Sequence, residues 1–282
     1  MDVKELFQLT RFEHALMLAL AVLIGETIVL GMVPPINAVL ALSLLVPIFS
    51  EMGSFALNDY LDIETDRLNR KMDRPLVRGT ISKGFALWFS IACLAASVIF
   101  AFFININAFM IALVFGALAV AYNWKLKDLP IVGNVYIAFT MAIPFIFGDF
   151  VYADSLLPVA LTLACLGFVA GLAREIIKSV QDMEGDLKAR HSKTIPIVIG
   201  EGPSLVIASV LYLLFIPLSA LPFLMGLPQK MPALMLVAIA DALILGIVYR
   251  IFSQGAYACG FARKASLIAF FIGLIGLLVA VI

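Results

Sequence analysis

The acidic residues of the sequence are concentrated in two short segments. The first segment, residues 58–66, reads N-D-Y-L-D-I-E-T-D. Asp59, Asp62 and Asp66 have the spacing i, i+3, i+7, which places side chains on one face of an α-helix. If the preceding helix continues through this segment, three carboxylates lie close together. Like charges at such separations repel one another, so the array predicts that a cation binds there.

The second acidic segment, D-M-E-G-D, runs from Asp182 to Asp186. These two aspartates are one helical turn apart, and continuing their stripe backwards adds Lys178 and Arg174. The same interpretation leaves Glu175 on another face. Both segments contain the pattern D-x-E-x-D and each follows a long apolar run, so we expect them to form a matched pair.

Paired carboxylate clusters of this kind predict a particular metal chemistry. Carboxylate oxygens without a neighbouring His or Cys suit hard cations, and Mg²⁺ above all. Mg²⁺ takes one or two carboxylates and fills its other positions with water and phosphate oxygens. Two clusters would therefore hold magnesium around one diphosphate and stabilise its charge as it leaves. The simpler interpretation is a solvated loop with exposed ion pairs, but matched clusters in a chain with 13% charged residues favour the metal site.

A third polar segment, residues 122–127, reads Y-N-W-K-L-K. Lys125 and Lys127 are candidates for neutralising phosphate oxygens, and Tyr122 is a candidate for donating a hydrogen bond to them. Arg74, beyond the first acidic segment, is a further phosphate candidate. Taken alone, the segment also fits the belt of aromatic residues and lysines at membrane interfaces.

The composition predicts which elements must position these side chains. Of the 282 residues, 63% are hydrophobic, and the mean hydropathy is +1.09. Soluble domains are about 45–50% apolar and about 25% charged. The composition therefore excludes a soluble globular domain, a disordered chain and a disulfide-rich secreted scaffold. We expect an all-α polytopic membrane protein, because the apolar runs lack the period-two alternation of barrel strands.

A membrane helix needs about 20 apolar residues, and the sequence predicts nine transmembrane helices in a bundle. The predicted spans are residues 13–32, 38–58, 84–104, 107–123, 132–152, 156–178, 204–224, 232–252 and 264–282. No polar linker divides the chain, so we expect one membrane-embedded domain over residues 1–282.

The distribution of basic residues predicts the orientation. With nine spans, the N-terminus and the loops 60–83, 124–131, 174–203 and 250–264 share one side, and every Lys and Arg except Lys230 lies there. The positive-inside rule places this side in the cytoplasm. We therefore expect a multi-pass protein of the cell membrane with cytoplasmic polar loops, a cytoplasmic N-terminus and the C-terminus outside.

These motifs resemble those of the UbiA superfamily of intramembrane prenyltransferases. Residues 58–66 match its first aspartate-rich motif, N-D-x-x-D-x-x-x-D, and residues 182–186 match its second, D-x-x-x-D. Tyr122 with Lys125 or Lys127 is similar to the Tyr/Lys motif between them, although a Y-x-x-x-K spacing would need Lys at position 126, which is Leu. The resemblance covers nearly the whole chain.

The resemblance implies a Mg²⁺-dependent transfer from an allylic diphosphate and a role for each matching residue. The implied metal ligands are Asn58, Asp59, Asp62, Asp66, Asp182 and Asp186, and the five aspartates are the expected catalytic residues. The residues expected to bind substrate are Asn58, Arg67, Arg74, Tyr122, Lys125, Lys127 and Lys178.

Residues 58–67 and 122–130 are most similar to archaeal members of the superfamily. That resemblance implies transfer of a geranylgeranyl group from geranylgeranyl diphosphate to the glycerol hydroxyl of geranylgeranylglyceryl phosphate, which forms the second ether bond of archaeal membrane lipids. The acceptor brings a second anion, which basic residues beside the acidic segments are expected to bind: Arg67, Arg70, Lys71, Arg74 and Arg78, with Lys188, Arg190 and Lys193.

Two alternatives stay open at this point. One is a prenyltransferase with an aromatic acceptor from a quinone, haem or chlorophyll pathway. The other, more remote, is a secondary transporter with an ion site. The expected partners are a prenyl diphosphate donor, a lipid acceptor and membrane lipids, with no nucleic acid and no evident obligate protein partner.

Overall fold

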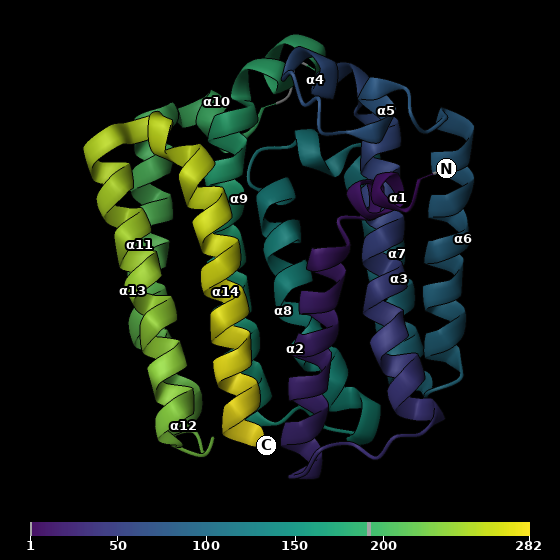
Figure 1. Cartoon of the computed structure of the whole chain (residues 1–282), viewed down its shortest axis with the longest axis vertical. Helices are drawn as coiled ribbons and strands as arrows, with labels where there is room; N and C mark the ends of the chain where they lie inside the picture. The colour runs from purple at the N-terminus through teal and green to yellow at the C-terminus, as the bar shows by residue number, and fades with distance from the viewer. Residues whose placement is uncertain (1, 191–192) are drawn as a thin grey trace.

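The structure, a computed structural model, describes residues 2–190 and 193–282, and every regular element in these two ranges is a helix. Figure 1 shows the long helices packed side by side as one bundle. They are α2 (Phe12–Leu30), α3 (Ala38–Leu61), α6 (Lys83–Phe102), α7 (Ile106–Trp124), α8 (Val132–Tyr152), α9 (Pro158–Arg190), α11 (Glu201–Ser219), α13 (Met231–Gln254) and α14 (Cys259–Val281). The predicted all-α membrane fold is confirmed.

Short helices connect the long ones. They are α1 (Val3–Thr10), α4 (Ile63–Leu68), α5 (Pro75–Arg78), α10 (Ile195–Ile199) and α12 (Leu221–Leu224), with the 3₁₀ helices η1 (Leu126–Asp128) and η2 (Gly255–Ala258). In Figure 1, α1, α4, α5 and α10 lie toward one end of the bundle, while α12 and the C-terminus lie at the other. The connections that carry the two acidic motifs are therefore brought to the same end.

Eight segments of the described chain are long and apolar enough to cross a membrane. The last of them, Met231–Val281, contains both α13 and α14. These two helices pack against each other, and the chain turns between them at Gly255, where φ is +58°. The predicted number of nine spans stays a prediction. The largest difference in bounds is at α9, which was expected to end at residue 178 and instead continues to Arg190.

Local sequence signals explain where several of the helices begin. The side chains of Asn37, Ser82 and Asn105 accept hydrogen bonds from backbone N–H groups in the first turns of α3, α6 and α7, at 2.8–3.2 Å. Each residue satisfies a donor that the helix leaves without an internal partner. Because these residues favour a helix start at their positions, the connections that precede α3, α6 and α7 lie at the ends of the bundle.

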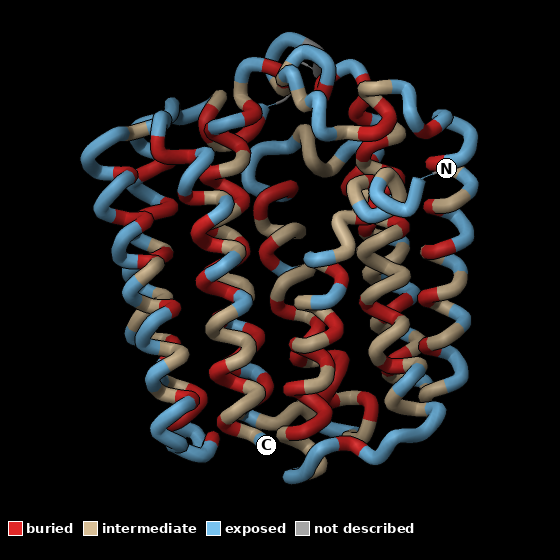
Figure 2. Tube along the Cα trace, in the orientation of Figure 1, coloured by how far each residue is buried: buried red, intermediate tan, exposed pale blue. Residues whose placement is uncertain are grey.

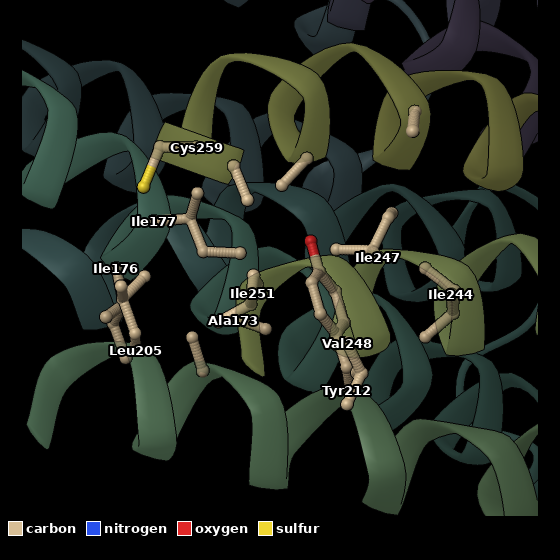
Figure 3. Packing of buried hydrophobic residues seen from close by; sticks show 14 of the residues in the cluster. Ala173, Ile176, Ile177, Leu205, Tyr212, Ile244, Ile247, Val248, Ile251 and Cys259 are labelled. Atoms are coloured by element: carbon tan, nitrogen blue, oxygen red, sulfur yellow. The ribbon is translucent and has the colours of Figure 1, made fainter. Parts of the chain in front are cut away.

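Buried residues face the interior of the bundle, and exposed residues follow the outer faces of the outer helices (Figure 2). Figure 3 shows one core cluster, in which Ile177 of α9, Leu205 and Tyr212 of α11 and Ile247 of α13 pack together. In the middle of the bundle α2 packs against α8 so closely that a Cβ on Gly148 would lie 2.3 Å from the Val22 carbonyl oxygen. This contact divides the interior into two compartments, one toward α3 and α7 and one toward α9 and α14.

Candidate active site

The first acidic motif does not continue as one helix, which corrects the sequence prediction. Helix α3 ends at Leu61, Asp62 adopts φ −100° and ψ 9°, and α4 begins at Ile63. The backbone N–H of Asp62 still donates to the carbonyl of Asn58 at 2.9 Å, so the chain bends without losing that bond. Because of this bend, the three aspartates do not share one face. Asp62 and Asp66 line a cavity, whereas Asp59 is buried in the wall of that cavity.

The second acidic motif lies on the extended α9. Asp182 and Asp186 line the same cavity as Asp62 and Asp66, together with Lys178. Glu175 also lines it, which corrects the prediction that this glutamate faces elsewhere. It lies seven residues, or two helical turns, before Asp182, so the two side chains share one face.

This polar cavity gathers most of the predicted site. The predicted residues that line it are Asn58, Asp62, Asp66, Arg74, Tyr122, Lys127, Lys178, Asp182 and Asp186. Lys71, which the sequence prediction assigned to the acceptor's phosphate, also lines it. The lining residues that the sequence prediction did not include are Arg11, Thr65, Gly133, Asn134, Glu175, Ser179 and Thr194.

Three predicted residues lie outside the lining. The Asp59 carboxylate is buried within the wall. Arg67 is exposed and its guanidinium lies 3.4 Å from Glu64 on the surface. Lys125 is exposed at the end of α7, whereas Lys127 points inward. Of the two lysines that spacing left open, only Lys127 faces the cavity.

Basic side chains join the two acidic motifs inside the cavity. The Lys71 ammonium lies 2.9 Å from Asp182 Oδ2 and 3.3 Å from Asp66 Oδ1, so one cation contacts both motifs. Lys127 Nζ lies 2.6 Å from Asp62 Oδ1. Burial lowers the pKa of the Lys127 ammonium, and the neighbouring carboxylates oppose that shift. The cavity thus concentrates negative charge that these cations partly neutralise.

The donor set of the cavity fits a hard divalent cation. The Asn58 amide, Asp62 and Asp66 offer oxygen ligands from the α3–α4 segment. Glu175, Asp182 and Asp186 offer them from α9. Within residues 2–190 and 193–282 no three His, Cys, Asp or Glu side chains stand in a ready metal-binding group. The carboxylates are instead drawn toward Lys71 and Lys127, and a metal ion would take the place of these lysines.

Arg11 is the most important residue that the sequence prediction missed. It lies between α1 and α2 with φ +46°, and its guanidinium lies 2.7 Å from Asp59 Oδ1 and 4.0 Å from the centre of the Phe55 ring. Arg74 reaches the same Asp59 oxygen at 3.4 Å. Burial lowers the pKa of Arg11 to about 10, which leaves it charged at neutral pH. No local pattern around position 11 indicates this contact, because its partner lies 48 residues away.

An asparagine outside the predicted motifs holds them in register. Asn69 Oδ1 accepts a hydrogen bond from the backbone N–H of Gly185 at 3.1 Å, and its Nδ2 donates to the Asp182 carbonyl at 3.5 Å. A Cβ at position 185 would lie 2.3 Å from the Asn69 amide. The glycine between the two aspartates of the second motif therefore allows the first motif to approach it.

A mainly apolar chamber lies deeper in the bundle, next to the polar cavity. Along α3, Asn58 lines the cavity and Ser54 lines the chamber one turn deeper. Along α8, Asn134 lines the cavity and Tyr136, two residues further, lines the chamber. Deeper walls of this α3–α8 chamber include Val46, Phe115, Ile143 and Phe147. The charged head of a substrate suits the polar cavity, and a long apolar tail suits this chamber.

Comparisons with known proteins identify the family of this chain. A model of the UbiA prenyltransferase family matches residues 17–275. A digeranylgeranylglyceryl phosphate synthase of Archaeoglobus fulgidus is 36% identical over 283 residues, covering 97% of this chain and 94% of that protein. Another, from Methanopyrus kandleri, is 35% identical and covers 98% of both chains.

Solved structures share the fold. A digeranylgeranylglyceryl phosphate synthase structure is 28% identical with a TM-score of 0.74, covering 99% of this chain and 98% of the other. A UbiA homologue from Archaeoglobus fulgidus, bound to GPP and Mg²⁺, is 24% identical with a TM-score of 0.68, covering 97% and 99%. Because the family model covers most of the chain, and relatives above 30% identity match nearly all of it, this chain belongs to the UbiA prenyltransferase family and is a membrane-embedded prenyltransferase.

Proposed function

We propose that the enzyme transfers a geranylgeranyl group from geranylgeranyl diphosphate to the glycerol hydroxyl of geranylgeranylglyceryl phosphate, forming the second ether bond of an archaeal lipid. The observation that carries a diphosphate reaction is the Lys71 side chain, which contacts Asp66 and Asp182 and so joins both acidic motifs in one cavity. Support for the acceptor comes from relatives named digeranylgeranylglyceryl phosphate synthase that match nearly the whole chain.

The cavity residues divide into metal ligands and diphosphate ligands. We assign Mg²⁺ to Asn58, Asp62, Asp66, Asp182 and Asp186, in line with a fold neighbour that is bound to GPP and Mg²⁺. When bound, Mg²⁺ neutralises the diphosphate and stabilises it as a leaving group. Lys71 and Lys127, which hold the carboxylates in this structure, would then be free to bind phosphate oxygens, with Tyr122, Lys178 and Arg74 beside them.

Asp59 has a different role in this proposal from the one its motif predicted. Its carboxylate lies 2.7 Å from Arg11 and 3.4 Å from Arg74, both of which line the cavity. Asp59 therefore positions two arginines and is not itself a metal ligand. Arg67 and Lys125, which are exposed, take no part in donor binding.

The reaction breaks the bond between C1 of the donor and the diphosphate oxygen, and both electrons leave with the diphosphate. The acceptor hydroxyl oxygen forms a bond to C1 and loses its proton. Electrostatic preorganisation of the cavity would supply most of the rate. The α3–α8 chamber would keep the donor tail out of water, where each methylene costs about 0.8 kcal/mol to expose.

The cellular arrangement follows from the same proposal. All of the chain, residues 1–282, would act as one domain, because the polar cavity uses side chains from both halves of the bundle. The end of the bundle that carries α4, α5 and α10 would face the cytoplasm of the cell membrane, since it also carries nearly all the basic residues.

The direct test incubates purified protein with geranylgeranyl diphosphate, Mg²⁺ and a panel of acceptors, followed by mass spectrometry. We expect alkylated geranylgeranylglyceryl phosphate, and no product when EDTA removes the metal. A product formed only with aromatic acids would overturn the acceptor assignment and leave the metal-diphosphate chemistry intact.

A further inference from the structure

The acceptor phosphate needs cations whose charge is not already balanced by protein carboxylates. Five of the basic residues beside the acidic motifs do not meet this condition. Arg78 pairs with Glu5 at 2.7 Å, Arg67 with Glu64, and Lys188 with Glu184. Lys71 and Arg74 contact the motif aspartates themselves. For these five side chains, the expectation that they bind the acceptor is not supported by their contacts. Arg70 and Lys193 are exposed on the surface and line neither the polar cavity nor the cavity between α9 and α14, and Arg190 lies among residues whose side chains the structure does not describe.

A separate cavity between α9 and α14 contains three cations that form no direct ion pair among the described residues, although Arg174 feels the charges of Glu51 and Glu175 at longer range. It has a volume of about 380 Å³ and is lined by Arg174, Gln181, Gly260, Arg263, Lys264 and Leu267. No Asp or Glu lines it. Among the described residues none of its three cations forms an ion pair; Arg263 donates to the neutral Gln181 Oε1 at 2.7 Å, and the buried Nε of Arg174 has no hydrogen-bond partner.

This basic cavity adjoins the polar cavity across the surface of α9. Arg174 immediately precedes Glu175, and Gln181 immediately precedes Asp182, so successive residues of one helix line the two cavities. Arg263 also interacts electrostatically with Asp182. An anion in the basic cavity would thus lie beside the diphosphate site.

A second apolar chamber lies next to the basic cavity and deeper in the bundle, on the side of the α2–α8 contact that faces α9 and α14. Along α9, Arg174 lines the basic cavity and Ala170 lines the chamber one turn deeper; along α14, Leu267 and Phe270 have the same relation. The bundle therefore holds two parallel arrangements of a charged cavity above an apolar chamber. One combines carboxylates with the α3–α8 chamber, and the other combines unpaired cations with this α9–α14 chamber.

We propose that the basic cavity binds the phosphate monoester of the acceptor through Arg174, Arg263 and Lys264, with the acceptor's tail in the α9–α14 chamber. This inference rests on the proposed function. The reacting hydroxyl of the acceptor is on the carbon next to the one that carries the phosphate, so a phosphate held beside Asp182 presents that hydroxyl to the polar cavity. Guanidinium groups suit this task because they bind phosphate through two parallel hydrogen bonds.

The test compares Arg263→Gln, Arg263→Lys and the control Lys188→Gln, which removes an exposed lysine from the same end of α9. Steady-state kinetics in detergent should give an acceptor KM raised about tenfold or more in Arg263→Gln, with the donor KM within about twofold of the wild type. Arg263→Lys should keep part of the acceptor affinity, and Lys188→Gln should leave both KM values unchanged. An unchanged acceptor KM in Arg263→Gln would overturn the proposal.

A binding measurement separates this inference from the proposed function. Thermal stabilisation of the wild type by geranylgeranylglyceryl phosphate should exceed that by geranylgeranylglycerol, which lacks the phosphate, and Arg263→Gln should remove the difference. This readout needs no turnover, so it holds even if the protein alkylates another acceptor. If the difference persists in Arg263→Gln, the cavity does not bind the acceptor phosphate and the proposal fails. The proposal also fails if the variant alters only the response to anionic lipid, measured in vesicles with and without phosphatidylglycerol, because the cavity then binds bulk lipid.

Discussion

At the scale of single residues, two lysines two positions apart have different environments. Lys127 Nζ lies 2.6 Å from Asp62 Oδ1 inside the polar cavity, while Lys125 is exposed. We expect Lys127→Ala to reduce kcat/KM for the donor by about tenfold or more, because a charge-assisted bond to phosphate contributes about 1.5–3 kcal/mol. Lys125→Ala is the control and should be close to wild type. Equal losses in the two variants would mean that the inward position of Lys127 has no role.

The buried contact between Arg11 and Asp59 predicts a coupled effect on stability. Removing the arginine in Arg11→Met leaves Asp59 buried with its weaker partner Arg74, and breaking a buried pair in this way costs about 3–5 kcal/mol. Thermal unfolding in detergent should detect this loss. Adding Asp59→Asn removes the unpaired charge and should restore most of the stability, whereas Arg67→Met, at an exposed pair, should have almost no effect. A double variant less stable than Arg11→Met would refute this account of the pair.

At the scale of elements, the register between α4 and α9 depends on Gly185. Because a Cβ there would overlap the Asn69 amide, Gly185→Ala should displace that side chain, break its hydrogen bonds to α9 and lower the rate. The matched control is Gly202→Ala on α11, where a Cβ would meet nothing within 4 Å. We expect the control to keep full activity. Normal activity in Gly185→Ala, measured with the same donor and acceptor, would show that the contact does not position the site.

The helices and the site could be predicted from the sequence to different extents. Apolar runs of membrane length and capping residues such as Asn105 identify most of the long helices within about five residues, because both signals are local. The exception is α9, whose polar last turns to Arg190 lie beyond its apolar run. The bend at Asp62 has no such signal, so Asp59 was assigned to the same face as its neighbours. Arg11 reaches Asp59 from a distant segment. Contacts between segments far apart in the sequence depend on tertiary packing, which helical periodicity does not specify.

At the scale of the whole molecule, the distribution of basic residues predicts which end of the bundle faces the cytoplasm. In a cysteine-free background, Arg70→Cys on the α4–α5 connection should be protected from a membrane-impermeant thiol reagent added outside intact cells. Gln229→Cys, beside Lys230 at the other end, should be labelled. Labelling of position 70 from outside would refute the orientation.

The central claim is that the two acidic motifs act as one metal-dependent site, and a double-mutant cycle tests it most directly. Prenyl transfer rates are measured for Asp62→Ala, Asp182→Ala and the double variant, with Glu184→Ala, an exposed residue of the second motif, as the control. Each single change should reduce the rate at least about 10²-fold, and the double variant should lose little more, because residues that work as a unit are not additive. A near-normal rate in either single variant, or losses that multiply in the double variant, would contradict the account.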